Sequence, residues 1–570
     1  MAFDILYFML PRAAAFLLAA VLLLIANRGA WEGYFSDDDL DNIAWTRGAG
    51  PAYFAQGLAS PRYYPQNFRP TGHFYFHILG RTAGLDFRWY LAVLQMLHLL
   101  NVCLVWRLCS SMELPAAATG AGALFFAFHM GVFDALWKPM YVFDVLCATF
   151  CLLALLCWRG SRPILSLLCF WMAYKSKELA VMLPLVLAAH ELFVREKRGK
   201  WEPLVPFFLV SAMFGAQALL SNPGAGADYS LRLSPAALAQ TVSFYSSKIL
   251  LAPYLGLGLL ALPWVVADRR LRFGLALSAA LLAPMLLLPG RLSGAYLYAS
   301  LPGLALTAAV ISSRAGFART ALFFSFWLPA NYLSLREQRK AELTVAHENR
   351  AYVEAVGDAV RTSPGTRTII YDGAPAAMRS WGIAGALRYF TGGEVELYSV
   401  EDKNLREALE KPAVMLLGWD GSSRKLHTAA RAAGAPDGSY LSMSRGTRIW
   451  QLEEGWYPLE GTFRWTRPRA RARLHRPPDA RRFDLSVNVG HALIHDLGRT
   501  RVELLIDGVP LGAREFTAPG WRQVHWDLPP APAGSAAIEF HVTPEYRPAT
   551  DPRILGIAIG GFGFAAKDSP

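Results

Sequence analysis

The sequence predicts a polytopic α-helical membrane protein followed by a small α/β domain and a C-terminal β-sandwich. Of its 570 residues, 54% are hydrophobic and only 18% are charged, whereas soluble domains average about 25% charged residues. Residues 1–334 contain 25 Lys and Arg and 16 Asp and Glu, and residues 335–570 contain 31 and 28. This uneven division excludes a single soluble globule and a disordered chain, and it indicates a membrane part before a soluble part.

The membrane part is predicted to cross the bilayer about eleven times, because a span needs about 20 mostly apolar residues. The candidate spans lie near residues 8–26, 90–108, 116–130, 141–157, 163–175, 179–194, 203–220, 247–267, 273–289, 296–313 and 318–334. No small-residue cleavage site follows the first stretch, which is therefore expected to remain as an anchor. Lys and Arg gather in every second loop, which is typical of cytoplasmic loops. We therefore expect a bacterial-type inner (plasma) membrane protein whose C-terminal domains are extracytoplasmic.

Three domains are expected, over residues 1–335, 336–455 and 456–570. The second begins with a polar helix at 336–361, after which short apolar runs alternate with helical patterns near 381–390 and 404–410. This alternation is typical of an α/β unit. The third contains apolar-polar alternation, at 483–489 for example, and the hairpin turn Asp507-Gly508 between two apolar runs. Such strands at regular spacing predict a β-sandwich.

Several classes of partner are excluded by composition. The six cysteines all precede residue 170 and form no Cys-x-x-Cys or Cys/His pattern, so no thiolate metal site is expected. His73 and His77 share a helical face, but no third ligand accompanies them. The net charge is +12, and +9 of it lies in residues 1–334, where the positive-inside rule accounts for it. No nucleic-acid partner, metal or cofactor is predicted.

Acidic residues directly follow the first span, at Asp37, Asp38 and Asp39. Like charges this close raise the pKa of at least one carboxyl unless a cation lies near. A carboxylate at the membrane surface is a candidate general base. The same residues also suit a solvated turn that caps a helix, and the sequence leaves both interpretations open.

Other charges lie between apolar stretches, where an unpaired charge costs at least about 2.5–3.5 kcal/mol. Such residues pair with each other or line a cavity. They are Asp134, Lys138, Asp144, Lys175, Lys177 and Glu178. His98 and Asn101, within the second span, are expected to form hydrogen bonds between helices.

Five motifs, in order along residues 1–334, resemble the GT-C glycosyltransferases, which are integral membrane enzymes that use lipid-phosphate-linked sugars. The likeness is to protein O-mannosyltransferases, including transmembrane proteins with tetratricopeptide repeats, although no such repeats occur here. The motifs are Tyr34-Phe35-Ser36-Asp37-Asp38-Asp39-Leu40, Phe68-Arg69-Pro70-Thr71, His98-Leu99-Leu100-Asn101, the spaced set His129, Asp134, Trp137 and Asp144, and the run from Ser176-Lys177-Glu178 to Pro184.

One motif departs from the family pattern. The family often has an acidic residue and an arginine before Tyr-Leu-Tyr in a late outer loop. Here Gly294 and Ala295 stand before Tyr296, and Arg291 is the arginine that can substitute. The segment from Asp551 to Gly556 weakly resembles jelly-roll domains of the carbohydrate-binding type.

The resemblance implies transfer of a sugar from a polyprenyl-phosphate donor to a hydroxyl acceptor, with inversion. Asp38 or Asp37 is then the base, and the cations for the donor phosphate are Arg69, Lys177 and Arg291. Glu178 and Asp134 are expected to orient those cations or the sugar hydroxyls. The further supporting residues are Asp39, His73, Lys138 and Asp144. The partners implied are the lipid bilayer, the lipid-linked donor and a protein, lipid or glycan acceptor, without any further cofactor.

Two other classes remain possible on sequence alone. A transporter of lipid-linked sugars also needs many spans and buried charges, although it is expected to show two similar halves, which are not evident. The departure at Gly294 and Ala295 favours a non-catalytic assembly or glycan-binding membrane protein. In the predicted β-sandwich, Trp521, Trp526 and Tyr546 either stack on sugars or fill the core.

Overall fold

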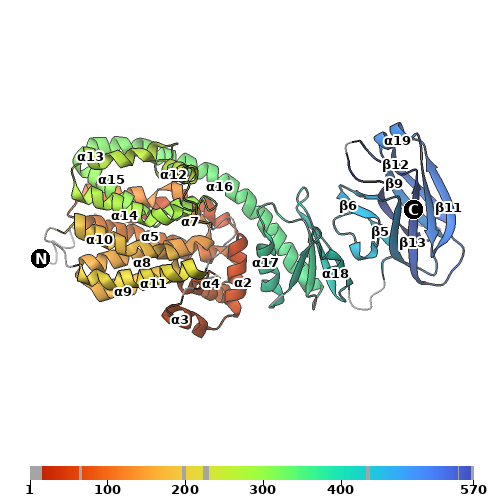
Figure 1. Cartoon of the computed structure of the whole chain (residues 1–570), viewed down its shortest axis with the longest axis horizontal. Coiled ribbons are helices and arrows are strands. Elements are labelled where there is room, and N and C mark those ends of the chain that lie inside the picture. The colour runs from red at the N-terminus through yellow and green to blue at the C-terminus, as the bar shows by residue number, and fades with distance from the viewer. Residues whose placement is uncertain are drawn as a thin grey trace. The chain divides into compact units, whose positions relative to one another are not determined.

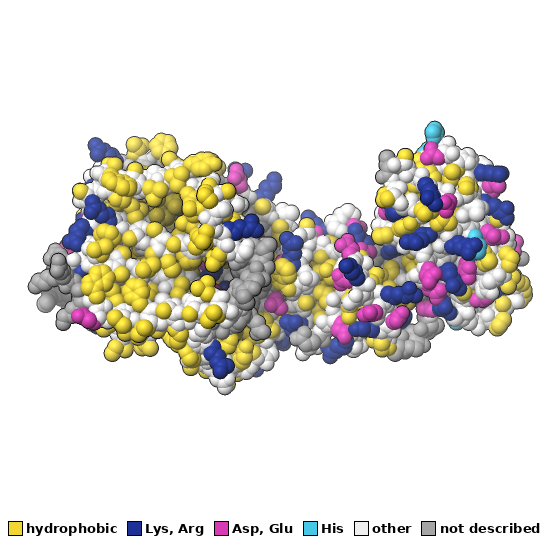
Figure 2. All heavy atoms as spheres, in the orientation of Figure 1, with side chains coloured by type: hydrophobic (Ala, Val, Ile, Leu, Met, Phe, Trp, Pro, Cys, Tyr) yellow, Lys and Arg dark blue, Asp and Glu magenta, His cyan; other side chains and the backbone are white. Residues whose placement is uncertain are grey.

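The computed structural model describes residues 16–62, 64, 67–195, 201–221, 230–393, 395–431, 437–549 and 551–566. The chain forms two compact units, Met1–Asn349 and Arg350–Pro570. The first unit is helical and the second is rich in strands (Figure 1). The mixed surface charge of the second unit contrasts with the hydrophobic surface of the first (Figure 2).

The first unit is a bundle of α-helices joined by short 3-10 turns. Its α-helices are α2 (Asp37–Gly48), α3 (Pro51–Ala59), α4 (Pro70–Thr82), α5 (Phe87–Ser111), α6 (Ala116–Ala127), α7 (Phe133–Trp137), α8 (Val142–Arg159), α9 (Pro163–Ser176), α10 (Leu183–Phe193), α11 (Val205–Ser221), α12 (Pro235–Ile249), α13 (Leu262–Val265), α14 (Arg269–Leu286), α15 (Leu301–Ala315) and the start of α16 (Phe317–Thr362). The 3-10 turns used below are η3 (Pro139–Tyr141), η4 (Glu178–Met182), η7 (Leu255–Ala261) and η8 (Gly294–Leu297).

Four helical segments within the described residues are long and apolar enough to cross a membrane. They are Phe87–Ser111, Ala116–Trp137, Pro139–Arg159 and Glu202–Ser221. Shorter apolar helices occur at Phe16–Ala26, Leu255–Val265 and Leu301–Ala315. The first candidate span, 8–26, lies partly outside the described residues, and the total of eleven spans stays a prediction. Large apolar side chains such as Ile164, at 76% exposure, are uncovered on this unit, as expected for contact with lipid.

Three of the expected helices, at 247–267, 318–334 and 336–361, have other boundaries in the structure. The stretch 247–267 is not one helix, because α12 ends at Ile249 and the chain passes Leu251 and Tyr254 with positive φ before η7 and α13. Conversely, the expected span at 318–334 and the polar helix at 336–361 form one continuous helix, α16. No Gly or Pro lies between residues 330 and 356 to end the helix.

Polar side chains connect the helices of the first unit as predicted for His98 and Asn101. His98 Nδ1 lies 2.8 Å from the Tyr298 hydroxyl, and Asn101 Nδ2 donates to that hydroxyl at 3.2 Å and to the Val145 carbonyl at 3.1 Å. These bonds join α5 to α8 and to the segment after η8. They therefore fix the position of Tyr296, two residues before Tyr298.

The second unit begins with a four-stranded sheet of order β2-β1-β3-β4. Its elements are β1 (Thr368–Asp372), α17 (Ser380–Thr391), β2 (Glu396–Ser399), α18 (Leu405–Glu410), β3 (Val414–Asp420) and β4 (Lys425–Arg431). The first three strands pair in parallel and β4 is antiparallel. The β-α-β alternation predicted from residue 368 to 417 is therefore present. The sequence patterns did not indicate β4, whose only large apolar residue is Leu426.

Two antiparallel sheets follow and share one cluster of buried side chains that includes Phe483, Val502, Phe540 and Phe562. Their orders are β11-β10-β13-β8 and β12-β9-β14-β7-β6, with β5 paired to β14. The strands are β5 (Tyr440–Ser442), β6 (Trp456–Glu460), β7 (Phe463–Thr466), β8 (Arg469–Arg476), β9 (Arg482–Val489), β10 (Thr500–Ile506), β11 (Val509–Phe516), β12 (Gly520–Asp527), β13 (Gly534–Thr543) and β14 (Ala558–Ala565). The Asp507-Gly508 turn joins β10 and β11 as predicted.

The three aromatic residues predicted either to stack on sugars or to fill the core, Trp521, Trp526 and Tyr546, have different environments. Trp526 and Tyr546 are buried, at 2% and 6% exposure, and belong to the shared core. Trp521 is 48% exposed. Core filling therefore accounts for two of the three residues, and Trp521 requires a separate explanation. The jelly-roll likeness stays a prediction.

Candidate active site

The three aspartates after the first span begin helix α2. Ser36 is the N-cap, and its backbone N–H and its hydroxyl both donate to Asp39 Oδ2, at 2.9 and 2.8 Å. This capping box explains the start of the helix. Asp39 is 1% exposed, and burial raises its pKa to about 7. Asp39 therefore has a structural role in the cap.

Asp37 and Asp38 differ from Asp39 because both are only partly buried. They occupy the first turn of α2, where the helix dipole favours negative charge. Asp38 also interacts electrostatically with the phenol of Tyr296 in η8. A carboxylate that is accessible from outside and close to the polar cluster described below is suited to accept a proton.

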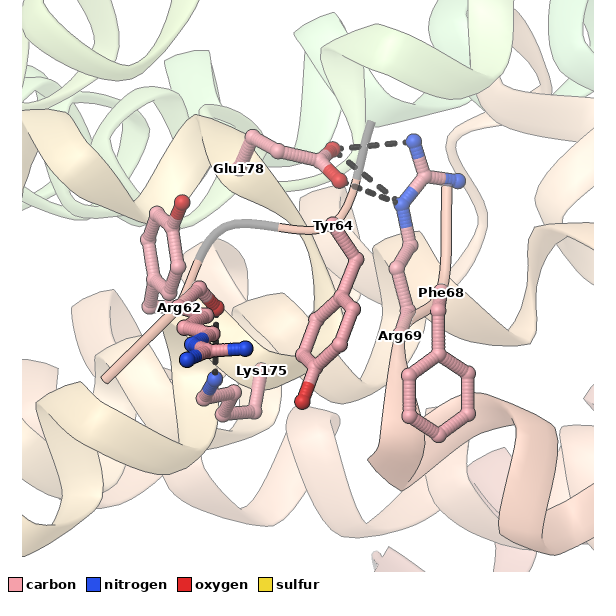
Figure 3. Close-up of a pocket in the computed structure, with 7 residues that line it drawn as sticks. Arg62, Tyr64, Phe68, Arg69, Lys175 and Glu178 are labelled. Atoms are coloured by element: carbon pink, nitrogen blue, oxygen red, sulfur yellow. Dashed lines mark hydrogen bonds and ion pairs between the residues drawn. The ribbon is translucent and has the colours of Figure 1, made fainter. Parts of the chain in front are cut away.

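Arg69 precedes Pro70, the first residue of α4, and forms a two-pronged ion pair with Glu178 of η4. Arg69 Nε lies 2.9 and 3.1 Å from the two Glu178 oxygens, and Nη2 lies 2.9 Å from Oε2. Burial alone would raise the pKa of Glu178, but the guanidinium holds it below its ordinary value. Arg69 also lies over the Phe143 ring, 5.3 Å from its centroid. Its Nη1 makes no bond to a described residue (Figure 3).

His73 connects the arginine to the helix of aspartates. The Arg69 backbone N–H donates to His73 Nδ1 at 2.9 Å, and His73 Nε2 lies 3.0 Å from Asn42 Oδ1. Because Nδ1 accepts, the ring proton is on Nε2, which donates to the amide oxygen of Asn42. Burial lowers the pKa of His73 to about 3. His73 is thus a neutral bridge that sets α4 against α2.

Lys177, at the end of α9, forms the second ion pair of the site. Its Nζ lies 2.5 Å from Asp144 Oδ1, and both side chains are buried, at 10% and 2% exposure. The same ammonium lies 4.2 Å from the centroid of the Tyr296 ring. Tyr296 also interacts electrostatically with Arg69 and Arg291. Tyr296 is therefore the common neighbour of the charged residues, and we name Arg69, Asp144, Lys177, Glu178 and Tyr296 the Lys177 cluster.

Asp134 and Lys138 form a separate network beside this cluster. Lys138 Nζ lies 3.1 Å from Asp134 and 2.9 Å from Glu342 of α16. Asp134 therefore holds Lys138 and does not hold any of the three expected phosphate-binding cations. Lys138 also acts electrostatically on Asp39, which places this pair on the α2 side of the site.

The structure adds residues that the sequence patterns did not single out. In the sequence, Tyr296 belongs to the Tyr-Leu-Tyr motif that departs from the family pattern, and no spacing rule predicts its contact with Lys177. Ser293, three residues earlier, lies 3.2 Å from the Tyr141 hydroxyl. Gly294 packs against the Gly131 carbonyl, so that a Cβ there would lie 2.3 Å from that oxygen. Glycine at this position therefore permits the close approach of η8 to the Gly131 backbone.

One small pocket adjoins the Lys177 cluster. It is lined by Arg62, Tyr64, Phe68, Arg69, Tyr174, Lys175 and Glu178 (Figure 3). Lys175 Nζ donates to the Ser60 carbonyl at 2.6 Å and lies 5.4 Å from the Trp171 ring centroid. This pocket combines three cations with aromatic walls and has one acidic side chain.

A second small pocket is apolar. Its lining residues are Ala148, Cys151, Leu152, Leu155, Leu183, Val186, Leu277, Leu281, Ala299 and Pro302. Ala148 and Cys151 lie one and two turns after Asp144 on α8, and Ala299 lies three residues after Tyr296. A polar cluster and an apolar pocket therefore follow each other along α8. Among the described residues, no group of three or more His, Cys, Asp or Glu is placed to hold a metal.

Comparisons with known proteins give remote similarities. No family model and no curated protein matches this chain. Similar solved structures include ArnT from Cupriavidus metallidurans bound to undecaprenyl phosphate, with a TM-score of 0.47 and 11% identity over 72% of this chain and 94% of that chain. ArnT from the same organism in the apo state has a TM-score of 0.43 and 12% identity over 73% and 94%.

Proposed function

We propose that this chain is a membrane glycosyltransferase of the GT-C type. It transfers a sugar from a polyprenyl-phosphate donor to a hydroxyl of a protein, lipid or glycan on the extracytoplasmic face. The observation that carries the proposal is the Lys177 cluster, in which the buried Lys177 and the partly buried Arg69 lie near the partly exposed carboxylate of Asp38. The motif resemblance supports the same reaction.

The cations suit a phosphate leaving group. Arg69 and Lys177 are held by Glu178 and Asp144, so they need no reorganisation when negative charge develops. Arg69 retains Nη1 for a phosphate oxygen, and Arg291 acts on the same region through Tyr296. A low-dielectric site strengthens each of these interactions relative to water.

The apolar pocket beyond Asp144 suits the lipid part of the donor. Its walls contain no charged side chain, so this region offers hydrocarbon an apolar surface with no charged group to desolvate. The order of the two parts along α8, polar and then apolar, matches a phosphate joined to an isoprenoid chain.

The reaction then proceeds by direct displacement. Asp38 takes the proton of the acceptor hydroxyl while its oxygen attacks the anomeric carbon. The bond between that carbon and the phosphate oxygen breaks, and polyprenyl phosphate leaves with the electron pair beside Arg69 and Lys177. One displacement inverts the configuration at the anomeric carbon. Asp37 is the alternative base.

The test uses purified protein in lipid nanodiscs, polyprenyl phosphates carrying radiolabelled sugars, and acceptor membrane extract. Loss of a general base lowers rates by about 10²–10⁴-fold, and we expect this for Asp38→Asn. Asp41→Asn, on the same helix, is the matched control and retains activity. If Asp37→Asn and Asp38→Asn both keep full activity, the base assignment is wrong. Translocation without transfer indicates a transporter, and donor binding without turnover indicates a non-catalytic protein.

A further inference from the structure

Two half-exposed aromatic side chains lie over the outer face of the sheet that contains β14. Trp521 of β12 is 48% exposed and Tyr440 of β5 is 46% exposed. They approach β14 from its two sides, because β9 connects β12 to β14 and β5 pairs directly with β14. The Phe463 ring meets Trp521 edge-on, with centroids 6.4 Å apart.

Glycines of β14 make room for both rings. A Cβ at Gly560 would lie 2.5 Å from the Trp521 ring, and a Cβ at Gly561 would lie 2.9 Å from the Tyr440 hydroxyl. Phe562 and Phe564 of the same strand are buried in the core. The core therefore accounts for the phenylalanines. It does not account for two large rings that cover the glycines and leave about half of their own surface in solvent.

Polar side chains form the rest of this face. Along β9, Asp484, Ser486 and Asn488 are partly exposed and alternate with buried apolar residues. They pair in register with His525, Gln523 and Trp521 of β12. The Asp484 carboxylate lies 2.7 Å from Arg482 Nε, and it acts electrostatically on Tyr440. Hydroxyl, amide and paired ionic groups thus stand directly beside the rings.

We propose that this face binds a saccharide built of uncharged sugar residues. The apolar C–H face of a sugar ring stacks on Trp521 or Tyr440, and its hydroxyls bond to Ser486, Asn488 and Gln523. Because Arg482 balances Asp484, the face complements an uncharged ligand better than a phosphate. This ring-and-amide face differs from the aliphatic and cationic surface that docks on lipid headgroups. The proposal is independent of the glycosyltransferase reaction.

The experiment uses the full chain in nanodiscs, applied to an array of neutral oligosaccharides, with titration calorimetry on the strongest ligand. Trp521→Ala is expected to lower affinity at least tenfold, the effect typical of a central aromatic anchor, and Tyr440→Ala several-fold. Trp381→Ala is the matched control, because Trp381 of α17 is 49% exposed and lies outside this face. It is expected to bind as the wild type does.

Two further variants keep the result interpretable if Trp521→Ala fails to fold. Trp521→Tyr retains a stacking ring and is expected to retain most of the affinity. Gln523→Ala removes one exposed hydrogen-bonding group on an edge strand and is expected to weaken binding about threefold. The proposal is overturned if no neutral oligosaccharide binds, if Trp521→Ala binds as tightly as Trp381→Ala, or if anionic lipid vesicles compete fully for the face.

Discussion

Two clusters of charged residues in the first unit combine similar residue types but differ in which charge is buried. The Lys177 cluster contains Tyr296, which follows the end of α14. The Asp268 cluster, made of Asp268, Arg270 and Arg314, lies at the start of the same helix. In the Asp268 cluster the carboxylate is buried, with 5% of its side chain exposed, whereas Arg314 is 52% exposed. In the Lys177 cluster the ammonium of Lys177 and its partner Asp144 are both buried, at 10% and 2% side-chain exposure, and the Arg69 and Glu178 side chains are 20% and 33% exposed.

The difference concerns which charge is removed from water. Asp268 accepts bonds from Arg270 at 2.8, 3.1 and 2.9 Å and from Arg314 at 3.1 Å, so it is saturated with donors. Its arginines remain partly hydrated, as expected for the predicted cytoplasmic loop. Lys177 has one carboxylate and an aromatic ring as neighbours. A buried cation with few partners is suited to an additional anion, which is the role proposed for Lys177.

The largest effect is expected when Lys177 is replaced. Lys177→Met removes the ammonium that is proposed to bind the donor phosphate and is expected to lower sugar transfer by at least about 10²-fold. Arg314→Met removes a cation of the Asp268 cluster and is expected to change the rate less than threefold. Initial rates with a radiolabelled lipid-linked sugar measure both. Equal losses in the two variants would remove the functional distinction between the clusters.

The next effect is on stability. Arg69→Met removes every hydrogen bond of the ion pair with Glu178, whose side chain is 33% exposed, and the expected cost is about 1.5–3 kcal/mol. Arg314→Met removes a half-exposed partner while Arg270 stays on Asp268, and the expected cost is below about 1 kcal/mol. Thermal unfolding in detergent compares the two variants. If the unfolding temperature falls less for Arg69→Met than for Arg314→Met, the Arg69–Glu178 ion pair contributes less to stability than expected.

The smallest effect is a dependence on pH. Burial raises the pKa of Asp39 to about 7 from 3.8, so the folded protein holds this proton more tightly than the unfolded chain. That stabilisation is complete below pH ~4 and is lost as the pH rises through 7, by about 2–3 kcal/mol between pH 5 and 8. The advantage of wild type over Asp39→Asn in unfolding temperature is therefore expected to fall across this range.

Asp268 provides the comparison for that measurement. Although burial opposes it, bonding to Arg270 and Arg314 lowers the pKa of Asp268 to about 2. A lowered pKa stabilises the folded state at every pH above the unfolded value, so the effect is constant between pH 5 and 8. The difference between wild type and Asp268→Asn is expected not to vary there. A slope like that of Asp39 would show that Asp268 lacks its arginine partners.

Local patterns predicted much of the second unit because they depend on neighbours in sequence. The parallel strands, α17, α18 and the hairpin at Asp507-Gly508 all occur where alternation and turn residues placed them. Weaker patterns were missed. In β8 Arg469, Arg471 and Arg473 alternate with smaller or apolar residues, and Ala470 and Ala472 are too small to signal a strand. The predicted domain boundary at 335 crosses α16, because charge changes there while helix propensity does not.

For the site, the sequence identified most of the charged residues but not their partners. It singled out Arg69, Asp144, Lys177 and Glu178, because charges between apolar stretches are costly. Their pairing, Arg69 with Glu178 and Lys177 with Asp144, joins residues 109 and 33 positions apart. No single-sequence pattern encodes such distances. The roles of these residues in catalysis stay predictions.

The sequence by itself determined the division into an apolar helical part and a charged, strand-rich part, because hydropathy and periodicity are properties of each segment. It also determined which charges are too costly to leave unpaired in the first part. Only the tertiary structure decided that Tyr296 lies against Lys177, that Asp39 caps α2 while Asp38 stays accessible, and that Trp521 is exposed while Trp526 is buried. These outcomes depend on which segments pack together, and burial and pairing are properties of that packing.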